Sequence, residues 1–305
     1  MTRHRVARLV LFRLPCLVLV AWLAMLAGCR GAPTQGPKPA GKLRVDFLDV
    51  GQGDSALITS PAGKTVLIDG GLHEAGTGVV TFLAGRGIDT LDLMLLTHRH
   101  ADHLGGLQAV VKKNGARLFM DAPFPHGIPA YDRLLEALDQ KHIPIRQAQQ
   151  GRTIDLGGGA RLTLLGPPEP PITDSRSDVN ANSVVSRMDW GKVGILFAAD
   201  AEAQTERRLL DSQANLRAAI LKVAHHGSRY STTPSFLQAV QPLIAVISVG
   251  VGNEYHHPDS QTLGRLERMG IRVFRTDLDG PIAIESDGER IQVIAHGRKE
   301  VFQVP

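Results

Sequence analysis

Cysteine is almost absent from this chain of 305 residues: the two that occur, Cys16 and Cys29, lie near its N-terminus. The rest of the chain therefore holds neither a disulfide nor a thiolate metal ligand. Its fold must depend on a hydrophobic core alone, and a segment of about 265 residues is long enough to bury one.

An excess of charge of one sign is also missing from most of the chain. The formal net charge is +4, but residues 1–28 contain four arginines and no acidic residue, so the remaining residues are balanced. This balance excludes the globally basic surface that general nucleic-acid-binding proteins present. Hydrophobic residues make up 43% and charged residues 21%, which excludes a disordered, collagen-like or coiled-coil chain.

The apolar run near the N-terminus, Leu14–Ala27, is short for a membrane-spanning helix. It follows four arginines and ends in Leu26-Ala27-Gly28-Cys29, which resembles a bacterial lipobox. We therefore predict a lipoprotein-type signal peptide over residues 1–28, lipidation of Cys29 and a flexible tether over residues 29–41. An uncleaved anchor helix is the alternative. Both interpretations export the chain to the bacterial cell envelope, facing the periplasm or on the surface, with a membrane anchor.

Strand-like and helical patterns alternate over the rest of the chain. The predicted strands cover residues 43–50, 55–59, 65–68, 91–96, 117–120, 161–165, 183–189, 192–198, 219–223, 243–249, 272–274, 281–285 and 290–295. The predicted helices cover residues 78–86, 104–113, 130–140, 202–210, 234–240 and 260–269, and residues 166–181 form a loop. Two strand-rich halves with interleaved helices favour an α/β (α+β) fold, in which two sheets pack face to face and helices cover the outside.

The 12 histidines supply the clearest chemical signal. Four residues that can bind metals follow directly after the buried strand predicted over residues 91–96: His98, His100, Asp102 and His103. Side chains two residues apart in an extended segment point to the same side, and the last two of the four lie where the chain turns into a helix. Imidazole and carboxylate ligands without thiolates suit zinc, manganese or iron. A polar loop that is rich in histidine by chance is the alternative.

The segment Thr97–His103 resembles the signature of the metallo-β-lactamase superfamily. A narrower resemblance is to the metallohydrolase domain of ComEC-type competence proteins, and more loosely to bacterial phosphorylcholine esterases. It rests on the segments Phe47–Ser55, Leu67–Gly71, Lys222–Ser228 and Asn253–Pro258. The resemblance implies a metallo-β-lactamase αββα sandwich over residues 42–305, in a stand-alone, exported relative of the ComEC domain.

The same resemblance implies two divalent metal ions, with zinc favoured over manganese. His98 and His100 would bind the first ion, whereas Asp102 and His103 would bind the second. Asp102, as a ligand beside the reacting group, also belongs to the expected catalytic residues.

Three more residues have roles in this resemblance. Asp200, at the end of a strand, would bridge two ions about 3.5–4 Å apart, and His225 would complete the second metal site. Asp69 would orient the metal-binding loop without touching a metal. The alternative role for Asp200 is an N-cap of the helix predicted over residues 202–210.

One departure from the superfamily pattern concerns the first metal ion. A third histidine usually lies between the signature and the bridging acid, but no histidine occurs between His142 and His225. An oxygen atom of Asn182, Asp178 or Asn180 would take its place, unless this segment is a solvated turn. A first site of this kind would exchange its metal readily and favour manganese over zinc more than a three-histidine site does.

Three polar residues near the predicted ligands remain: His226, Ser228 and His257. We expect one of them to donate a hydrogen bond or a proton to the leaving group. A structural place in a loop is the alternative for each.

These features predict a metal-dependent hydrolase in which a hydroxide held between two metal ions attacks the substrate. The fold does not choose between lactams, thioesters and phosphoesters. The ComEC-like segments favour a phosphodiester, with DNA first and a surface phosphodiester such as phosphorylcholine or teichoic acid second. The alternatives are an exported β-lactamase or thioesterase, a phosphorylcholine-esterase-like surface enzyme, and a binding module with a degenerate metal site.

Overall fold

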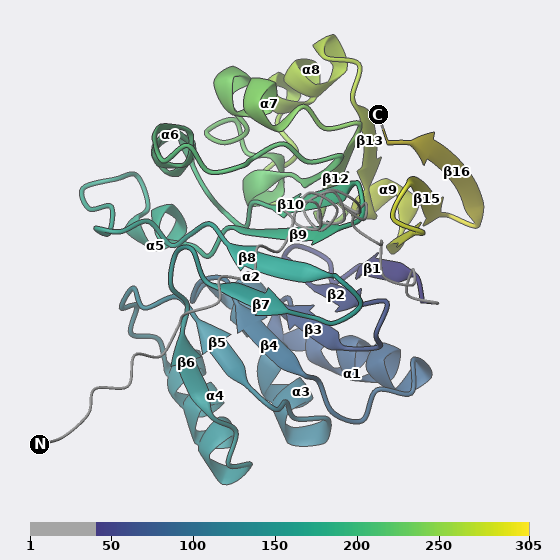
Figure 1. Ribbon diagram of the computed structural model, residues 1–305. Helices are drawn as coiled ribbons and strands as arrows, with labels where there is room; N and C mark the ends of the chain where they lie inside the picture. Colours follow the sequence, from purple (N-terminus) through teal and green to yellow (C-terminus); the bar gives the residue numbers. More distant parts are fainter. Residues whose placement is uncertain (1–40, 305) are drawn as a thin grey trace, which may run out of the picture. The chain divides into compact units, whose positions relative to one another are not determined.

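The computed structural model describes residues 41–304 (Figure 1). The predicted signal peptide, Cys29 and the predicted tether up to residue 40 lie outside the described residues. Among the helices that are described, none combines the length and the apolar character that crossing a membrane requires.

The described strands form two sheets. The nine-stranded sheet has the order β16-β15-β14-β1-β2-β3-β4-β5-β6, and the seven-stranded sheet has the order β13-β12-β11-β10-β9-β8-β7. The first sheet consists of β1 Leu43–Phe47, β2 Ala56–Thr59, β3 Thr65–Ile68, β4 Leu93–Leu96, β5 Phe119–Asp121, β6 Ile145–Gln147, β14 Ile282–Ser286, β15 Arg290–Ala295 and β16 Arg298–Gln303. The second consists of β7 Thr153–Asp155, β8 Arg161–Leu164, β9 Ser186–Trp190, β10 Val193–Phe197, β11 Ile220–Lys222, β12 Ile244–Ile247 and β13 Arg272–Arg275.

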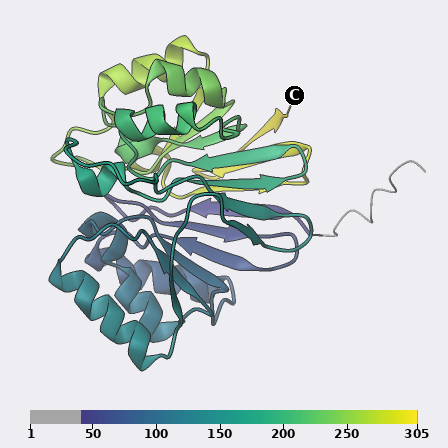
Figure 2. The ribbon, with the colours of Figure 1, turned by 60° about the vertical axis from the view of Figure 1, so that its left-hand side comes forward.

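Helices cover the outer face of each sheet, so the layers run helix, sheet, sheet, helix (Figure 2). The nine-stranded sheet carries α1 Gly76–Gly85, α3 Leu107–Lys113 and α4 Pro129–Gln140, and the seven-stranded sheet carries α6 Ala203–Asp211, α7 Pro234–Val240 and α8 Ser260–Arg268. The connections contain the shorter α2 Ala101–Leu104, α5 Asp178–Ala181, α9 Thr276–Asp279, η1 His73–Ala75 and η2 Ala224–Gly227. The αββα sandwich expected from the sequence is therefore confirmed.

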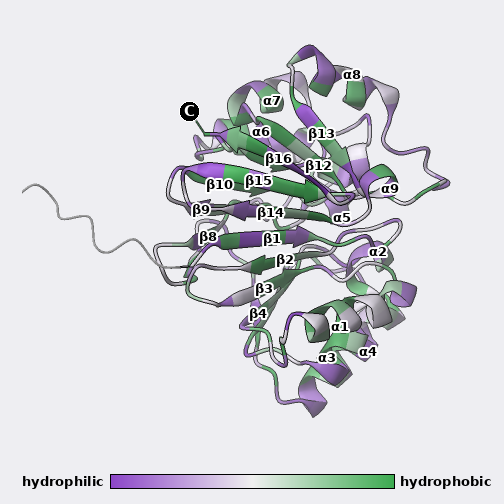
Figure 3. Ribbon diagram, turned by 90° about the vertical axis from the view of Figure 1, so that its right-hand side faces the viewer, coloured by the Kyte–Doolittle hydropathy of each residue, from purple (hydrophilic) through white to green (hydrophobic). Residues whose placement is uncertain are grey.

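Strand β4 shows how the sequence produces these layers. Its four residues are all buried, as a continuous apolar run predicts. Leu93 and Leu95 point into the core between the two sheets, whereas Met94 and Leu96 pack with the helices on the outside. In Figure 3, hydrophobic residues are frequent along the strands, whereas outer helices such as α4 carry both hydrophobic and hydrophilic residues.

The helix expected over residues 104–113 is interrupted. The chain forms α2 and α3 with Gly105 and Gly106 between them. A Cβ atom at Gly106 would collide with the carbonyl oxygen of Gly70, so the start of α3 approaches the end of β3 more closely than any other residue type allows. This close approach fixes the histidine-rich loop against the neighbouring strand.

The sequence did not predict β6, β7 and β16, nor the short helices α5 and α9. Strands β6, β7 and β16 lie at or near sheet edges, and most of their residues are exposed or half-buried. The alternation of buried and exposed side chains that indicates a strand is therefore weak in them.

Candidate metal centre

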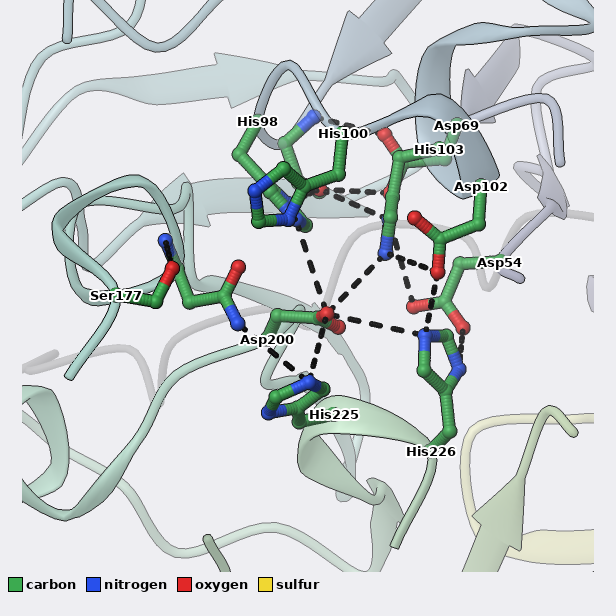
Figure 4. Close-up of polar contacts among 12 residues, drawn as sticks. Asp54, Asp69, His98, His100, Asp102, His103, Ser177, Asp200, His225 and His226 are labelled. Atoms are coloured by element: carbon green, nitrogen blue, oxygen red, sulfur yellow. Dashed lines mark hydrogen bonds and ion pairs between the residues drawn. The ribbon is translucent and has the colours of Figure 1, made fainter. Parts of the chain in front are cut away.

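The histidine-rich residues lie where the two sheets meet, at the ends of parallel strands. Strands β3 and β4 are parallel in one sheet, and β10 and β11 are parallel in the other. Because the carboxyl ends of parallel strands meet at one edge of a sheet, the loops after these four strands converge. Figure 4 shows side chains from these loops directed toward one another.

One group of side chains surrounds the carboxylate of Asp200, the residue three positions beyond β10. Its Oδ2 lies 3.7 Å from Nε2 of His98 and 3.4 Å from Nε2 of His103. Nδ1 of His100 lies 3.1 Å from Nε2 of His98. His98, His103 and Asp200 are each at most 2% exposed. Their ligand atoms lie within 4.8 Å of one another, close enough for one metal ion.

A second group lies beside the first and contains Asp102, His103 and His226. Nε2 of His226 is 3.2 Å from Oδ2 of Asp102 and 3.7 Å from Oδ2 of Asp200 (Figure 4). His103 and Asp200 thus face both groups. The arrangement suits two neighbouring cations with Asp200 between them.

The orientation of His103 is set by Asp69, the residue that the resemblance implied would orient the metal-binding loop. Nδ1 of His103 donates a hydrogen bond of 2.8 Å to Oδ2 of Asp69, which leaves Nε2 directed toward Asp200. The same carboxylate accepts hydrogen bonds from the backbone N–H and the hydroxyl of Thr97, at 2.8 and 2.7 Å. Because the Thr97 hydroxyl donates to Asp69, it accepts from Nδ1 of His98, 3.1 Å away. Both imidazoles are held in the tautomer that metal binding requires.

His226 has an equivalent support that sequence reasoning missed. Its Nδ1 donates to the carbonyl oxygen of Ser248 at 2.9 Å and lies 3.4 Å from Oδ1 of Asp54. Asp54 in turn forms a buried ion pair with Lys222. Asp54 belongs to the Phe47–Ser55 segment and Lys222 to the Lys222–Ser228 segment. The signal that could have found them is a charged residue just before or at the end of a buried strand, β2 for Asp54 and β11 for Lys222.

The electrostatics of the cluster favour positive charge. Burial by itself lowers the pKa of His226, but Asp200 and Asp54 outweigh it and raise the pKa to about 10. Burial likewise opposes a high pKa in His103, which Asp200 and Asp102 raise well above its ordinary value. Burial would raise the pKa of Asp200, but the nearby His103 and His226 lower it well below the ordinary range. The carboxylates therefore stabilise positive charge on the neighbouring imidazoles, as they would stabilise bound metal cations.

The donor atoms fit divalent metal ions. Nε2 of His103, Nε2 of His226 and Oδ1 of Asp200 are buried and have no hydrogen-bond partner. Leaving such atoms unsatisfied costs free energy, and a bound cation would satisfy them. Imidazole nitrogen with carboxylate oxygen is a ligand set for zinc, manganese or iron.

The backbone at this site adopts conformations that non-glycine residues rarely take. The φ angles of His225 and His226 are 49° and 53°, those of Asp69 and Ala199 are 58° and 48°. Positive φ angles in non-glycine residues are strained, and such strain clusters at functional sites. Because His225 and His226 are both left-handed, their side chains leave η2 in different directions.

His225 points away from the second group and toward a different acid. Its Nε2 is 3.8 Å from Oδ2 of Asp200, and its Nδ1 is 3.4 Å from Oε1 of Glu202. Its side chain is 17% exposed, compared with 2% for His226. The distances thus favour His226 over His225 for the second group, the reverse of the sequence assignment. Glu202, and not Asp200, is the N-cap residue of α6, so the capping role considered for Asp200 is wrong.

Asn182 was wrongly chosen as a candidate ligand. Its amide oxygen accepts from the backbone N–H of Ile172, and its amide nitrogen donates to two backbone carbonyl oxygens, so the side chain holds a loop. Asp178 is used in the same way, because it accepts from the backbone and hydroxyl of Ser175. Asn180 faces the cluster instead: its Nδ2 lies 3.5 Å from Nε2 of His225, and its Oδ1 is buried without a partner.

The remaining predicted residues, Ser228 and His257, have different surroundings in the structure. The hydroxyl of Ser228 accepts a hydrogen bond from the backbone N–H of Tyr230, so it supports the loop after η2. The ring of His257 lies 5.7 Å from that of His225, and burial lowers its pKa to about 4. His257 is therefore neutral at neutral pH and does not carry the extra proton that a donor would give to a leaving group.

A cavity of about 710 Å³ opens onto these residues. Asp102, Asp200, His225 and His226 lie on its wall. Its outer part is lined by Gln52, Arg176, Arg229, Tyr230, Tyr255, His256 and His257. The volume falls in the range of small-molecule and cofactor sites.

Comparisons with known proteins point to one family. Residues 48–251 match the family model of the Metallo-beta-lactamase superfamily. ComE operon protein 3 of Bacillus subtilis is 32% identical over 258 residues, which cover 78% of this chain and 32% of that protein. Competence protein ComA of Neisseria gonorrhoeae is 32% identical over 247 residues, which cover 80% of this chain and 32% of that protein. The chain spans about a third of the length of these curated relatives.

Solved structures agree on the fold. The metallo-beta-lactamase fold protein YhfI from Bacillus subtilis superposes with a TM-score of 0.52 and 13% sequence identity. The match covers 80% of this chain and 100% of that one. At this level of identity the likeness concerns the fold alone.

Proposed function

This chain belongs to the metallo-beta-lactamase superfamily of metal-dependent hydrolases, and we propose that it hydrolyses a phosphodiester at a site for two divalent metal ions. The observation that carries the proposal is the position of Asp200, whose carboxylate lies between two groups of potential ligands. The relative named Competence protein ComA supports a nucleic-acid phosphodiester, with DNA as the first candidate.

The proposed ligands follow from the distances. His98, His100 and Asp200 would hold the first ion, and Asp102, His103, Asp200 and His226 would hold the second. When bound, the two ions would supply Lewis acidity and activate water for hydrolysis of the phosphodiester. Zinc is the favoured metal because most of the proposed ligands are imidazole nitrogens, and manganese is second because the first group has fewer imidazoles than the superfamily pattern supplies.

We assign proton transfer to His225. Its ring lines the cavity, and Nδ1 lies 3.4 Å from Oε1 of the buried Glu202, a contact that favours one orientation of the ring. Nε2 then faces Asp200 and the cavity, where it can give a proton to the oxygen of the leaving group. The role that we expected for His226 or His257 therefore passes to their neighbour.

The rim of the cavity supports a phosphoester rather than a lactam. The guanidinium groups of Arg176 and Arg229 both line it, and arginine binds phosphate oxygens through paired hydrogen bonds. Residues 29–305 have no net excess of positive charge, so electrostatic attraction of the substrate must come from this rim and from the metal ions.

Export and anchoring remain part of the proposal. Lipidation of Cys29 after removal of residues 1–28 would hold residues 42–305, the proposed hydrolase domain, at an envelope membrane. Cys29→Ser should abolish processing of the chain and attachment of the lipid, because both depend on the cysteine. Unchanged processing and lipid attachment would contradict the lipoprotein interpretation.

The test of the proposed function combines metal analysis with a substrate panel. The full-length chain should bind two equivalents of zinc or manganese and cleave DNA or bis(p-nitrophenyl) phosphate. His226→Ala should lose about one equivalent of metal, whereas His225→Ala should keep its metal and lose turnover. Asp200→Ala should lose metal and turnover while the chain stays folded. Hydrolysis of a lactam or thioester, with no phosphodiester cleaved, would overturn the assignment.

A further inference from the structure

We propose that Tyr255 is a stacking platform for a nucleobase beside the phosphodiester that is cleaved, so that the chain acts on unpaired strands of nucleic acid. The inference rests on the proposed function and deepens it by naming the substrate class. It comes from the outer part of the cavity, which the proposed hydrolytic residues do not explain.

The exposure of Tyr255 points to a ligand. Its side chain is 59% exposed, although it lines the same cavity as Asp102 and Asp200. The ring stacks on His257, with centroids 6.0 Å apart and planes at 25°, and His257 contacts His225. A series of rings thus leads from the proposed proton donor to the rim. One face of Tyr255 rests on His257, and the exposed remainder of the ring offers apolar area to a flat partner.

The loop that carries Tyr255 is held in place before any ligand arrives. The side chain of Asn253 donates to the carbonyl oxygens of Gly250 and His257, at 3.0 and 2.7 Å. Its amide oxygen accepts from the backbone N–H of His257 at 2.9 Å. These three hydrogen bonds close the loop around Tyr255, so little conformational entropy is lost when a base stacks on it.

The same rim provides cations for the strand that carries the base. Arg176 and Arg229 lie over the ring of Tyr230, with guanidinium carbons 3.8 and 5.0 Å from its centroid. Glu202 lies 3.5 Å from the guanidinium of Arg176, and the hydroxyl of Tyr230 accepts from Arg229. Two guanidinium groups fixed in this way suit the phosphates that flank the cleaved one, while Tyr255 receives the base.

Base stacking on Tyr255 excludes a paired duplex as the preferred substrate. In a duplex both faces of each base are covered by neighbouring bases, so a base must leave the stack before it can reach a protein ring. The charge balance of residues 29–305 also provides no broad basic surface for a duplex. An unpaired strand avoids both difficulties, because its bases are free to stack on a protein ring and because it needs contact with only a few positively charged groups.

The test compares strands that differ in their bases alone. One substrate is an oligothymidylate, the second is a strand of the same length with abasic tetrahydrofuran units, and the third is a duplex that contains the thymidylate. The full-length chain loaded with zinc or manganese should show a kcat/KM at least about fivefold higher for oligothymidylate than for the abasic strand, because aromatic stacking typically contributes that much per base. The duplex should be cleaved more slowly than the oligothymidylate.

The ratio of the two kcat/KM values is the readout for variants. Tyr255→Ala should bring the ratio close to one, mainly through a higher KM for oligothymidylate, and Tyr255→Phe should restore it. Val301→Ala is the matched control, because Val301 is also 59% exposed and lies in β16, away from this cavity. A ratio near one in the unmodified chain, a ratio unaffected by Tyr255→Ala, or a duplex cleaved as fast as the single strand would overturn the inference. Cleavage of neither strand, with bis(p-nitrophenyl) phosphate still hydrolysed, would also overturn the inference, whereas cleavage of no phosphodiester at all would refute the proposed function.

Discussion

The buried ion pair between Lys222 and Asp54 gives a test of how the metal centre is supported. The two residues are 3% and 6% exposed, and Asp54 also faces Nδ1 of His226. Lys222→Met removes the positive charge but keeps a long apolar side chain, which leaves the Asp54 carboxylate with His226 as its cationic neighbour. Breaking a buried ion pair by removing one partner typically lowers the free energy of unfolding by about 3–5 kcal/mol. We expect a loss of this size in the metal-free chain.

The double variant D54N/K222M separates the pair from the shape of the site. With both charges removed, no uncompensated charge is buried, so most of the lost stability should return. Burial raises the pKa of Asp54, but Lys222 and His226 outweigh it and hold the pKa below 3.8. Because the folded-state pKa is the lower one, the carboxylate stabilises the fold above pH 3.8, and this contribution is lost as the pH falls further.

The assay is urea unfolding at pH 7 in the presence of a chelator, because bound metal would add its own stabilisation. The midpoint should fall in the single variant with little change in the slope. If the free energy of unfolding of the single variant lay within about 1 kcal/mol of that of the unmodified chain, the reasoning would be refuted, since so small a loss is outside the range for broken buried ion pairs. A double variant no more stable than the single one would refute it as well.

Three further predictions concern the core, the pH dependence of stability and the substrate rim. Leu95→Ala removes a fully buried side chain between the two sheets and should lower the free energy of unfolding by about 2–5 kcal/mol, again measured in urea; a loss near zero would contradict the tight inter-sheet packing. Burial raises the pKa of Glu206, although the backbone N–H groups of Thr232 and Thr233 donate to its carboxylate. Because the folded-state pKa is the higher one, the unmodified chain should lose stability relative to Glu206→Gln as the pH rises above 4.5, as measured in thermal melts. A stability difference that does not depend on pH would contradict this prediction. If Arg176 and Arg229 each contact one phosphate, replacing both with Ala should reduce the slope of log affinity against log salt by about 1.4, and an unchanged slope would remove them from the substrate site.

The sequence predicted the parts of the centre that are local. His98, His100, Asp102 and His103 lie within six residues, so their spacing alone indicates a metal site. Asp200 was assigned through the resemblance to the superfamily, whose bridging acid also follows a strand. These residues meet for a topological reason, the convergence of strand ends, which the alternation of strands and helices already implies.

The rest of the centre depends on features that the spacing of residues does not encode. Asp54 reaches His226 across the chain, and Glu202 reaches His225 from the start of a helix. The order of the two adjacent histidines could not be resolved, because it is set by the left-handed backbone at both positions. Asn182 looked like a ligand by its place in the chain, but its side chain is consumed by hydrogen bonds to the backbone.

The position of the centre at the seam between the two sheets links metal supply to the survival of the fold. His98 and His103 come from the first half of the chain, whereas Asp200 and His226 come from the second, so bound ions would tie the two halves together. By mass action, the chain would be most resistant to proteolysis where zinc or manganese is plentiful and most easily degraded where it is scarce. The abundance of this protein in the cell would then follow the local concentration of its own cofactor.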